Sequence, residues 1–229
     1  MTIHITVASN VYREDLKKLE YPYYEDVRNE FYKVKGLPGP ALTWSEYAQF
    51  FNSFPLNENI EIYGLMHYRC ALNFKSNKVK MKYSERDSFF KKQSNLFDKH
   101  KNKIVVGTKL QFTTTAWDQY CSPSEHAANL PIMEKACEKF YELTGYDAKQ
   151  HLQSTNYLYS RNIFISPPDF AKRWYKISLE IAKYMNLMDS PHKTDDRWGG
   201  FILERLFSVY VSFEREYEIV ERPLVFFTD

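Results

Sequence analysis

The sequence predicts an α/β fold in which a mostly parallel, mixed central sheet is flanked by helices. Strand-like segments of alternating or unbroken apolar character take turns along the chain with segments whose apolar residues recur at helical spacing. With 229 residues, the chain is long enough to bury a large core without a disulfide or metal staple. No internal repeat or low-complexity linker divides it, so we expect one domain over residues 1–229.

Several segments have the patterns typical of strands. Residues 3–9 alternate and are rich in β-branched side chains. Residues 60–66 and 103–110 are largely apolar runs, which indicates strands buried on both faces. Further strands are expected at 157–166, which two prolines follow, and at 217–227.

Helices are predicted where apolar residues recur every three or four positions and so share one face. Thr43 is a candidate N-cap of the first helix. Gly145 is a candidate C-cap of the second, because glycine readily adopts the left-handed conformation that ends many helices. The predicted helices cover residues 43–54, 129–143, 168–188 and 197–215.

Charge and cysteine content argue against several classes of protein. The 31 basic and 29 acidic side chains give a formal net charge of +2, so we expect no nucleic-acid partner. Cys70, Cys121 and Cys137 are odd in number and widely spaced, which indicates a reducing compartment rather than a disulfide framework or a zinc site. No apolar run reaches the roughly 18 residues of a membrane span, and no signal-peptide pattern opens the chain. We therefore expect a cytoplasmic protein.

Lysines are concentrated in residues 75–93 and 98–103. Such a section is usually a solvated surface. It also suits contact with an anionic membrane surface or with a phosphate-bearing substrate. Peripheral contact with the inner face of the membrane is therefore the alternative to a fully solvated surface.

The common motifs of nucleotide and metal sites are absent. The sequence has no GxxxxGK[ST], GxGxxG, HExxH or GxSxG pattern and no paired Cys/His spacing, which argues against most ATPases, dehydrogenases, hydrolases and zinc enzymes. Asp195 and Asp196 form the one suggestive acidic pair, a weak candidate site for Mn²⁺ or Mg²⁺. Adjacent carboxylates before a helix are more often a solvated turn that favours the helix N-terminus.

Polar residues interrupt the apolar sequence directly after the strand 60–66. His67, Tyr68 and Arg69 would stand at the carboxyl end of that strand, where open α/β sheets bind their ligands. An arginine there can donate two hydrogen bonds to phosphate or carboxylate oxygens. The structural alternative is that Arg69 pairs with a buried carboxylate and His67 is a hydrogen-bonded core residue.

Glu204 and Arg205 stand in an otherwise apolar part of the helix predicted at 197–215. At least one of them must therefore point inward or into a cleft. A carboxylate in a cleft suits a general base. A glutamate paired with an arginine is structural, and this second arrangement is the commoner one.

Four stretches occur together in an order that resembles a known family: IYGLMHYRCALNF, WDQYCSPSEH, NIFISPPDFAKRW and RWGGFILERLFSVY. The family comprises short glycosyltransferase-like domains, catalogued as a domain of unknown function and found in capsular polysaccharide and O-antigen gene clusters. The resemblance covers residues 40–225. Cys70 stands where the family usually carries a second arginine.

The resemblance implies a GT-A-like, nucleotide-sugar-binding sandwich that works as a hexosyl- or pentosyltransferase. Its substrates would be a nucleotide-sugar donor and a glycan or lipid-linked acceptor in surface polysaccharide synthesis. The departing diphosphate needs its charge neutralised by a divalent cation or by cationic side chains. No convincing Asp-x-Asp pair follows a strand, so two alternatives stay open. The cofactor is Mn²⁺ or Mg²⁺, or the mechanism is metal-independent and Arg69 or Arg197, with His67, takes the place of the metal.

The resemblance also implies roles for individual residues. Glu204 is predicted to be the catalytic base of an inverting transfer, with His67 and Arg69 as the other catalytic residues. Asp195 and Asp196 compete with Glu204 for the role of base. The predicted donor-binding residues are Val7, Ala8, Ser9, Asn10, Tyr68, Arg197 and Arg205, and the predicted acceptor or sugar contacts are Gln119, Tyr120 and His126.

Two other interpretations stand beside the transferase. One is a non-catalytic nucleotide- or carbohydrate-binding module with the same fold. The other is a scaffold in which the polar residues only form salt bridges. Retention of both Glu204 and Arg69 favours the enzyme, because a decayed site would be expected to lose charges that are costly to bury.

Overall fold

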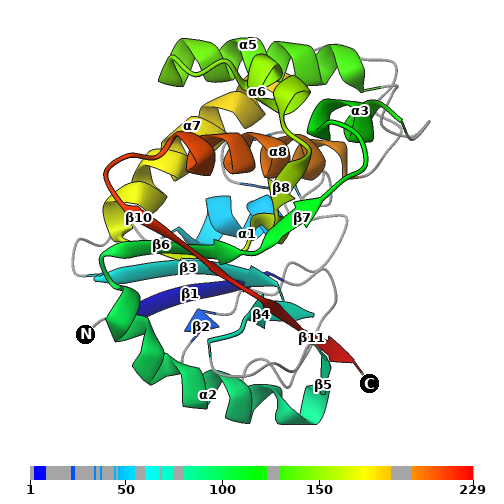
Figure 1. Cartoon of the computed structure of the whole chain (residues 1–229). Helices are drawn as coiled ribbons and strands as arrows, with labels where there is room; N and C mark the ends of the chain where they lie inside the picture. The colour runs from blue at the N-terminus through cyan, green and yellow to red at the C-terminus, as the bar shows by residue number, and fades with distance from the viewer. Residues whose placement is uncertain are drawn as a thin grey trace.

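The structure is a computed structural model, and it describes residues 3–8, 22–23, 34, 37, 44, 46–54, 60–67, 69–74, 80–122, 129–186 and 197–228. Within these residues a mixed sheet lies between helices on both of its faces (Figure 1). One face is covered by α2 (Arg86–Phe97). The other is covered by α1 (Glu46–Ser53), α7 (Pro168–Asn186) and α8 (Trp198–Phe213). An outer layer on that side holds α3 (Ala116–Cys121), α5 (Leu130–Thr144) and α6 (Ala148–Ser154).

The strands of the sheet are β1 (Ile3–Ala8), β2 (Pro22–Tyr23), β3 (Ile62–His67), β4 (Cys70–Leu72), β5 (Lys80–Lys82), β6 (Lys103–Gly107), β9 (Phe164–Ser166), β10 (Glu218–Arg222) and β11 (Leu224–Thr228). Their order is β10-β6-β9-β3-β4-β11-β5, with β1 paired to β3 and β2 paired to β1. Among the described strands, β4 and β9 run against the common direction of the others. The mostly parallel, mixed sheet flanked by helices that the sequence predicts is therefore confirmed.

A separate two-stranded ribbon connects the sheet to the outer helices. It pairs β7 (Lys109–Gln111) with β8 (Tyr157–Tyr159) in antiparallel register. The strand predicted at 103–110 accordingly ends earlier than expected, at Gly107, and the chain passes through Thr108 into the ribbon.

The helix ends follow from local chemistry. Gly145 ends α5 with φ 75°, and its N–H donates to the Tyr141 carbonyl, as the sequence predicts for a glycine C-cap. Asp147 accepts the Gln150 amide and begins α6. The Thr43 cap predicted for α1 lies outside the described residues.

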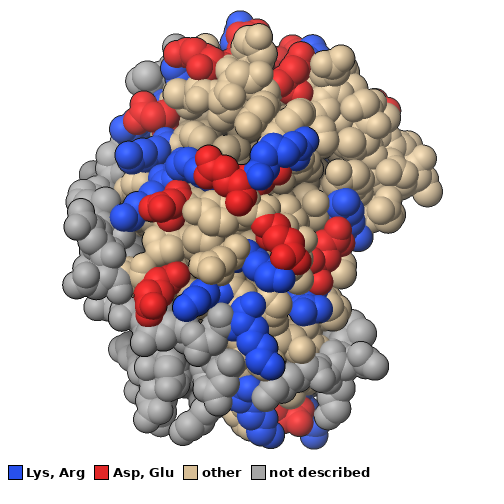
Figure 2. All heavy atoms as spheres, turned by 60° about the vertical axis from the view of Figure 1, so that its left-hand side comes forward, with Lys and Arg blue, Asp and Glu red and all other residues tan. Residues whose placement is uncertain are grey.

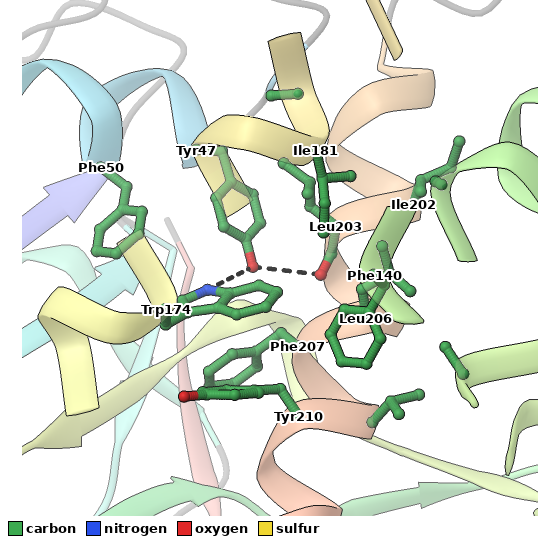
Figure 3. Packing of buried hydrophobic residues seen from close by; sticks show 14 of the residues in the cluster. Tyr47, Phe50, Phe140, Trp174, Ile181, Ile202, Leu203, Leu206, Phe207 and Tyr210 are labelled. Atoms are coloured by element: carbon green, nitrogen blue, oxygen red, sulfur yellow. Dashed lines mark hydrogen bonds between the residues drawn. The ribbon is translucent and has the colours of Figure 1, made fainter. Parts of the chain in front are cut away.

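The larger core lies between the sheet and the layer of α1, α7 and α8 and continues to the outer helices α3, α5 and α6, and many of its side chains are aromatic (Figure 3). The ring of Trp174 packs at 5.4 Å on both Phe207 and Tyr210. The Tyr47 hydroxyl accepts the indole N–H of Trp174 at 3.2 Å and lies 3.3 Å from the Leu203 carbonyl oxygen. Full burial of such a side chain contributes about 2–3 kcal/mol to folding, so this core holds α8 firmly against the sheet.

The smaller core lies between the sheet and α2, a helix that the sequence analysis did not predict. Among the α2 residues whose side chains the structure describes, the buried ones are Arg86, Phe89, Gln93 and Phe97, which recur at intervals of three and four and therefore form one face. The ring of Phe89 meets Phe227 of β11 at 5.5 Å. Two of the four buried residues are polar, and this hid the helical pattern within the Lys-rich section.

Two predicted strands are each broken in the structure. The segment 157–166 is wrong as a single strand: β8 ends at Tyr159, a turn follows at Ser160–Asn162, and β9 begins at Phe164. The segment 217–227 is divided into β10 and β11 at Pro223, because proline has no N–H to donate to a strand ladder.

Candidate functional site

The parallel strands end together at one edge of the sheet. β1, β3, β6 and β10 reach this edge at Ala8, His67, Gly107 and Arg222, and we call it the carboxyl edge. In open α/β sheets, ligands bind just beyond the carboxyl ends of the strands. The sequence analysis placed His67 there, and the structure does so too.

The polar tripeptide after β3 is the connection of a hairpin. His67 pairs with Cys70 in antiparallel register, so β3 and β4 form a hairpin with Arg69 in its connection. The Arg69 amide donates to Nδ1 of His67 at 3.1 Å, and the exposed Arg69 accepts the Phe227 amide on its carbonyl at 2.7 Å. Because Nδ1 accepts a hydrogen bond, a neutral His67 ring carries its proton on Nε2, where it can serve as a donor.

A second turn, residues 160–162, lies at the same edge. It directly precedes β9, which runs antiparallel to β3 with Phe164 opposite Leu65. It also packs on the end of β6, since a Cβ at Gly107 would lie 3.1 Å from both the Cβ and the carbonyl oxygen of Ser160. The turn at residues 160–162 therefore closely approaches the ends of two neighbouring strands, and a side chain at position 107 would crowd Ser160.

Two consecutive residues of this turn adopt the left-handed conformation. Arg161 has φ 62° and ψ 35°, and Asn162 has φ 51°. The Arg161 amide donates to Oε1 of Glu204 at 3.0 Å, and the buried Oδ1 of Asn162 accepts the Tyr47 hydroxyl at 3.1 Å. Left-handed backbone is unfavourable for residues other than glycine, so these contacts from α8 and α1 hold the turn in place.

Glu204 is thereby brought to the carboxyl edge. It is half-buried on α8, and its contact with Arg161 joins it to the turn that borders β3 and β6. The structure therefore unites two predicted catalytic elements, the His67–Arg69 hairpin and Glu204, at one edge of the sheet. Arg161 was missed by the sequence analysis, although it stands in a polar triplet inside an apolar segment, the same signal that singled out His67.

The neighbouring Arg205 lies in a different environment. It is 4% exposed, and its Nη1 and Nη2 donate to the Phe201 carbonyl at 2.9 Å and to Oε1 of Gln119 at 2.6 Å. Its guanidinium lies 4.5 Å from the centroid of the buried Tyr120 ring. Burial lowers the pKa of the Arg205 guanidinium. These contacts join α8 to α3 and bring the predicted site residues Arg205, Gln119 and Tyr120 together. The described contacts of Arg205 are made within the protein, between two helices.

The remaining predicted site residues either lie apart from Glu204 in the chain or fall outside the described residues. Arg197 precedes α8 and places its guanidinium 5.2 Å from the centroid of Phe201. Val7 and Ala8 pair along the backbone with the end of β3. Ser9, Asn10, Tyr68, His126, Asp195 and Asp196 lie outside the described residues. Among the residues that the structure does describe, no group of three or more His, Cys, Asp or Glu side chains is arranged to hold a metal ion.

A pocket of about 430 Å³ lies far from the carboxyl edge, near the amino end of β10. Its lining includes Tyr146, Arg173, Lys176 and Glu214. Arg173 donates to Glu214 at 3.1 Å and also pairs with Glu216. The side of the molecule that Figure 2 brings forward carries basic and acidic side chains interspersed, and no single sign of charge dominates it.

The fold is one that a known glycosyltransferase shares. Residues 44–215 match the family described as a domain of unknown function, DUF4422, and the chain therefore belongs to this family. The solved apo structure of the WbbM bifunctional glycosyltransferase is similar to this chain with a TM-score of 0.67 and 16% sequence identity. The match covers 100% of this chain and 45% of that one, so the chain spans less than half of the relative's length.

These comparisons confirm the resemblance to a glycosyltransferase-like family of unknown function. At 16% identity, the likeness to WbbM establishes the fold alone. No curated protein matches the sequence. The described helices include none that is long and apolar enough to cross a membrane.

Proposed function

We propose that the protein is a glycosyltransferase that moves a sugar from a nucleotide-sugar donor to a glycan or lipid-linked acceptor in surface polysaccharide synthesis. One observation carries the proposal: Glu204 and the His67–Arg69 hairpin, distant in sequence, both lie at the carboxyl edge of a sheet whose fold a glycosyltransferase shares. The carboxyl edge is where the fold class binds nucleotides. The proposed donor is a nucleoside diphosphate sugar.

Glu204 is proposed as the base of an inverting transfer. The acceptor hydroxyl oxygen bonds to the anomeric carbon as the bond from that carbon to the diphosphate oxygen breaks. The hydroxyl proton passes to Glu204, and the diphosphate leaves with the bonding electron pair. A carboxylate has several acceptor positions, so the bond from the Arg161 amide to one oxygen is compatible with this role.

The leaving diphosphate must be stabilised as its charge develops. The exposed Arg69 and the Nε2–H of His67 are proposed to do so at the end of β3. Asp195 and Asp196 stay weak candidates for a Mn²⁺ or Mg²⁺ site. Dependence of nucleotide binding on the metal separates the two mechanisms, because cationic side chains bind a diphosphate without it.

A thermal-shift screen tests the donor assignment. The purified protein is heated with uridine, guanosine, cytidine or thymidine diphosphate and with their sugars, each with and without Mn²⁺. A ligand at 100 times its Kd stabilises the native state by about 2.7 kcal/mol, so the correct nucleotide should raise the melting temperature selectively. The absence of a shift with every nucleotide would overturn the proposal.

Turnover then separates the enzyme from the non-catalytic binding module. Release of the nucleoside diphosphate from the selected donor, alone and with glycan acceptors, is expected to continue over many turnovers. Substitution Glu204→Gln should suppress it because an amide cannot take up the acceptor proton. Tight binding without any turnover would favour the binding module instead.

A further inference from the structure

We infer that Arg161 is the side chain that receives the diphosphate of the donor, in a turn that the protein holds in a strained conformation for this purpose. The inference rests on the proposed function and adds a binding residue to it. Three features of the described residues support it: the backbone of Arg161, the position of its guanidinium, and the surroundings of its charge.

The backbone of Arg161 is held against its own preference. The left-handed region costs a non-glycine residue about 1–2 kcal/mol, and Asn162 next to it is left-handed as well. Glycine would relieve this strain at position 161, so an arginine there brings a stability cost with it. Strain of this kind persists where surrounding contacts enforce it and is concentrated at functional sites. Here Glu204 holds the amide of one residue and Tyr47 holds the side chain of the next.

The guanidinium of Arg161 lies on the side of the carboxyl edge that β11 and the β3–β4 hairpin form. It lies 5.2 Å from the centroid of the Phe226 ring. Phe226 pairs with Cys70, and the next residue along β11 donates its amide to the Arg69 carbonyl. The side chain of Arg161 thus extends from the turn at residues 160–162 to β11, the strand that pairs with the hairpin containing Arg69.

The charge of Arg161 is not neutralised by the described part of the protein, where no carboxylate lies within ion-pair distance of its guanidinium. The guanidinium of the exposed Arg161 lies over the face of the Phe226 ring. By contrast, Arg173 at the far side of the molecule pairs with both Glu214 and Glu216. An arginine fork with no carboxylate partner among the described residues, stacked on the strand that pairs with the Arg69 hairpin, matches the paired oxygens of a diphosphate.

The test is calorimetric titration of the folded protein with the nucleoside diphosphate selected in the thermal-shift screen and with the corresponding nucleoside. Arg161→Gln is expected to weaken diphosphate binding by about 10- to 100-fold, since a hydrogen-bonded charge is lost. Binding of the nucleoside should change by less than about twofold. Arg215→Gln is the matched control, because Arg215 is also exposed but lines the pocket at the opposite edge.

A second variant separates strain from binding. Arg161→Gly is expected to weaken diphosphate binding as much as Arg161→Gln does, yet to raise the melting temperature of the free protein by about 2–4 °C. Wild-type protein that binds no nucleoside diphosphate would overturn the proposed function itself. Wild-type protein that binds it, with Arg161→Gln and Arg161→Gly binding equally well, would overturn only the assignment of Arg161.

Discussion

Helix α8 sends two neighbouring charged residues into two contrasting regions. Arg205 enters the buried contact between α8 and α3, where a carbonyl and an amide oxygen accept its hydrogen bonds. Glu204 reaches the carboxyl edge, where it holds the left-handed Arg161. In the first region two guanidinium nitrogens of Arg205 donate to protein oxygens, whereas in the second the guanidinium of Arg161 belongs to an exposed residue. The difference supports the proposal that the α3–α8 contact contributes to stability and that the carboxyl edge binds the ligand.

The largest effect is expected from breaking the buried contact. Arg205→Ala should destabilise the protein by about 3–4 kcal/mol, because it leaves a cavity and deprives Gln119 of its donor. Urea unfolding measures the loss, and nucleotide affinity of the folded protein should stay unchanged. Unchanged stability together with lost nucleotide binding would instead support the prediction that Arg205 binds the donor.

A pH titration of stability gives the next largest effect. Burial lowers the pKa of His4 on β1 to about 4 from its ordinary value of 6.5. The unfolded state therefore takes up a proton before the native state does, so stability present above pH 6.5 is lost as the pH falls towards 4, by about 2–3 kcal/mol. Urea unfolding at several pH values checks this, and the slope should largely disappear in His4→Gln.

His4 is a buried residue that lies away from the carboxyl edge, so its substitution separates an effect on stability from an effect on nucleotide binding. It lies near the amino end of β1, stacked on Tyr63 at 5.3 Å, and away from the carboxyl edge. Nucleotide affinity of the folded His4→Gln variant should match that of the wild type. A pH dependence of stability that survives in His4→Gln would contradict the assignment of this effect to His4.

A smaller effect on stability is expected from removal of the Tyr47 hydroxyl, which contacts Trp174 in the core and Asn162 in the turn at the carboxyl edge. Tyr47→Phe removes the acceptor of the Trp174 indole N–H and the donor to Asn162, at a cost of about 1–2 kcal/mol. It should also weaken diphosphate binding a few-fold, because the turn at residues 160–162 loses its hydrogen bond to Tyr47. Tyr141→Phe, in a tyrosine that is 58% exposed, is the control and should change neither quantity.

The smallest effect is expected at the solvated surface of α7. Lys183 pairs with Glu180 at 2.7 Å, and both side chains are about half exposed. Because exposed ion pairs contribute little, Lys183→Ala should change the free energy of unfolding by less than about 0.5 kcal/mol. This variant sets the baseline for the urea measurements. A decrease of more than about 1 kcal/mol in the free energy of unfolding would show that this exposed ion pair contributes more than predicted.

Sequence patterns located the elements better than they located the turns. The helical repeat of Trp174 and its neighbours predicted α7, and the polar residues after β3 predicted one side of the carboxyl edge. The turn at residues 160–162 was not predicted, since its conformation depends on Glu204 and Tyr47, which are distant in sequence. The divergence of Glu204 and Arg205 likewise depends on which helices pack beside α8. Local spacing cannot specify that.

The most direct test of the central claim is a crystal structure of the protein with its bound nucleotide-sugar donor. We predict that the diphosphate lies at the carboxyl edge, within hydrogen-bond distance of Arg161 and beside the His67–Arg69 hairpin, with Glu204 facing the sugar. The pocket lined by Arg173 and Lys176 offers the alternative location. A donor seated there, with the carboxyl edge unchanged, would contradict the account.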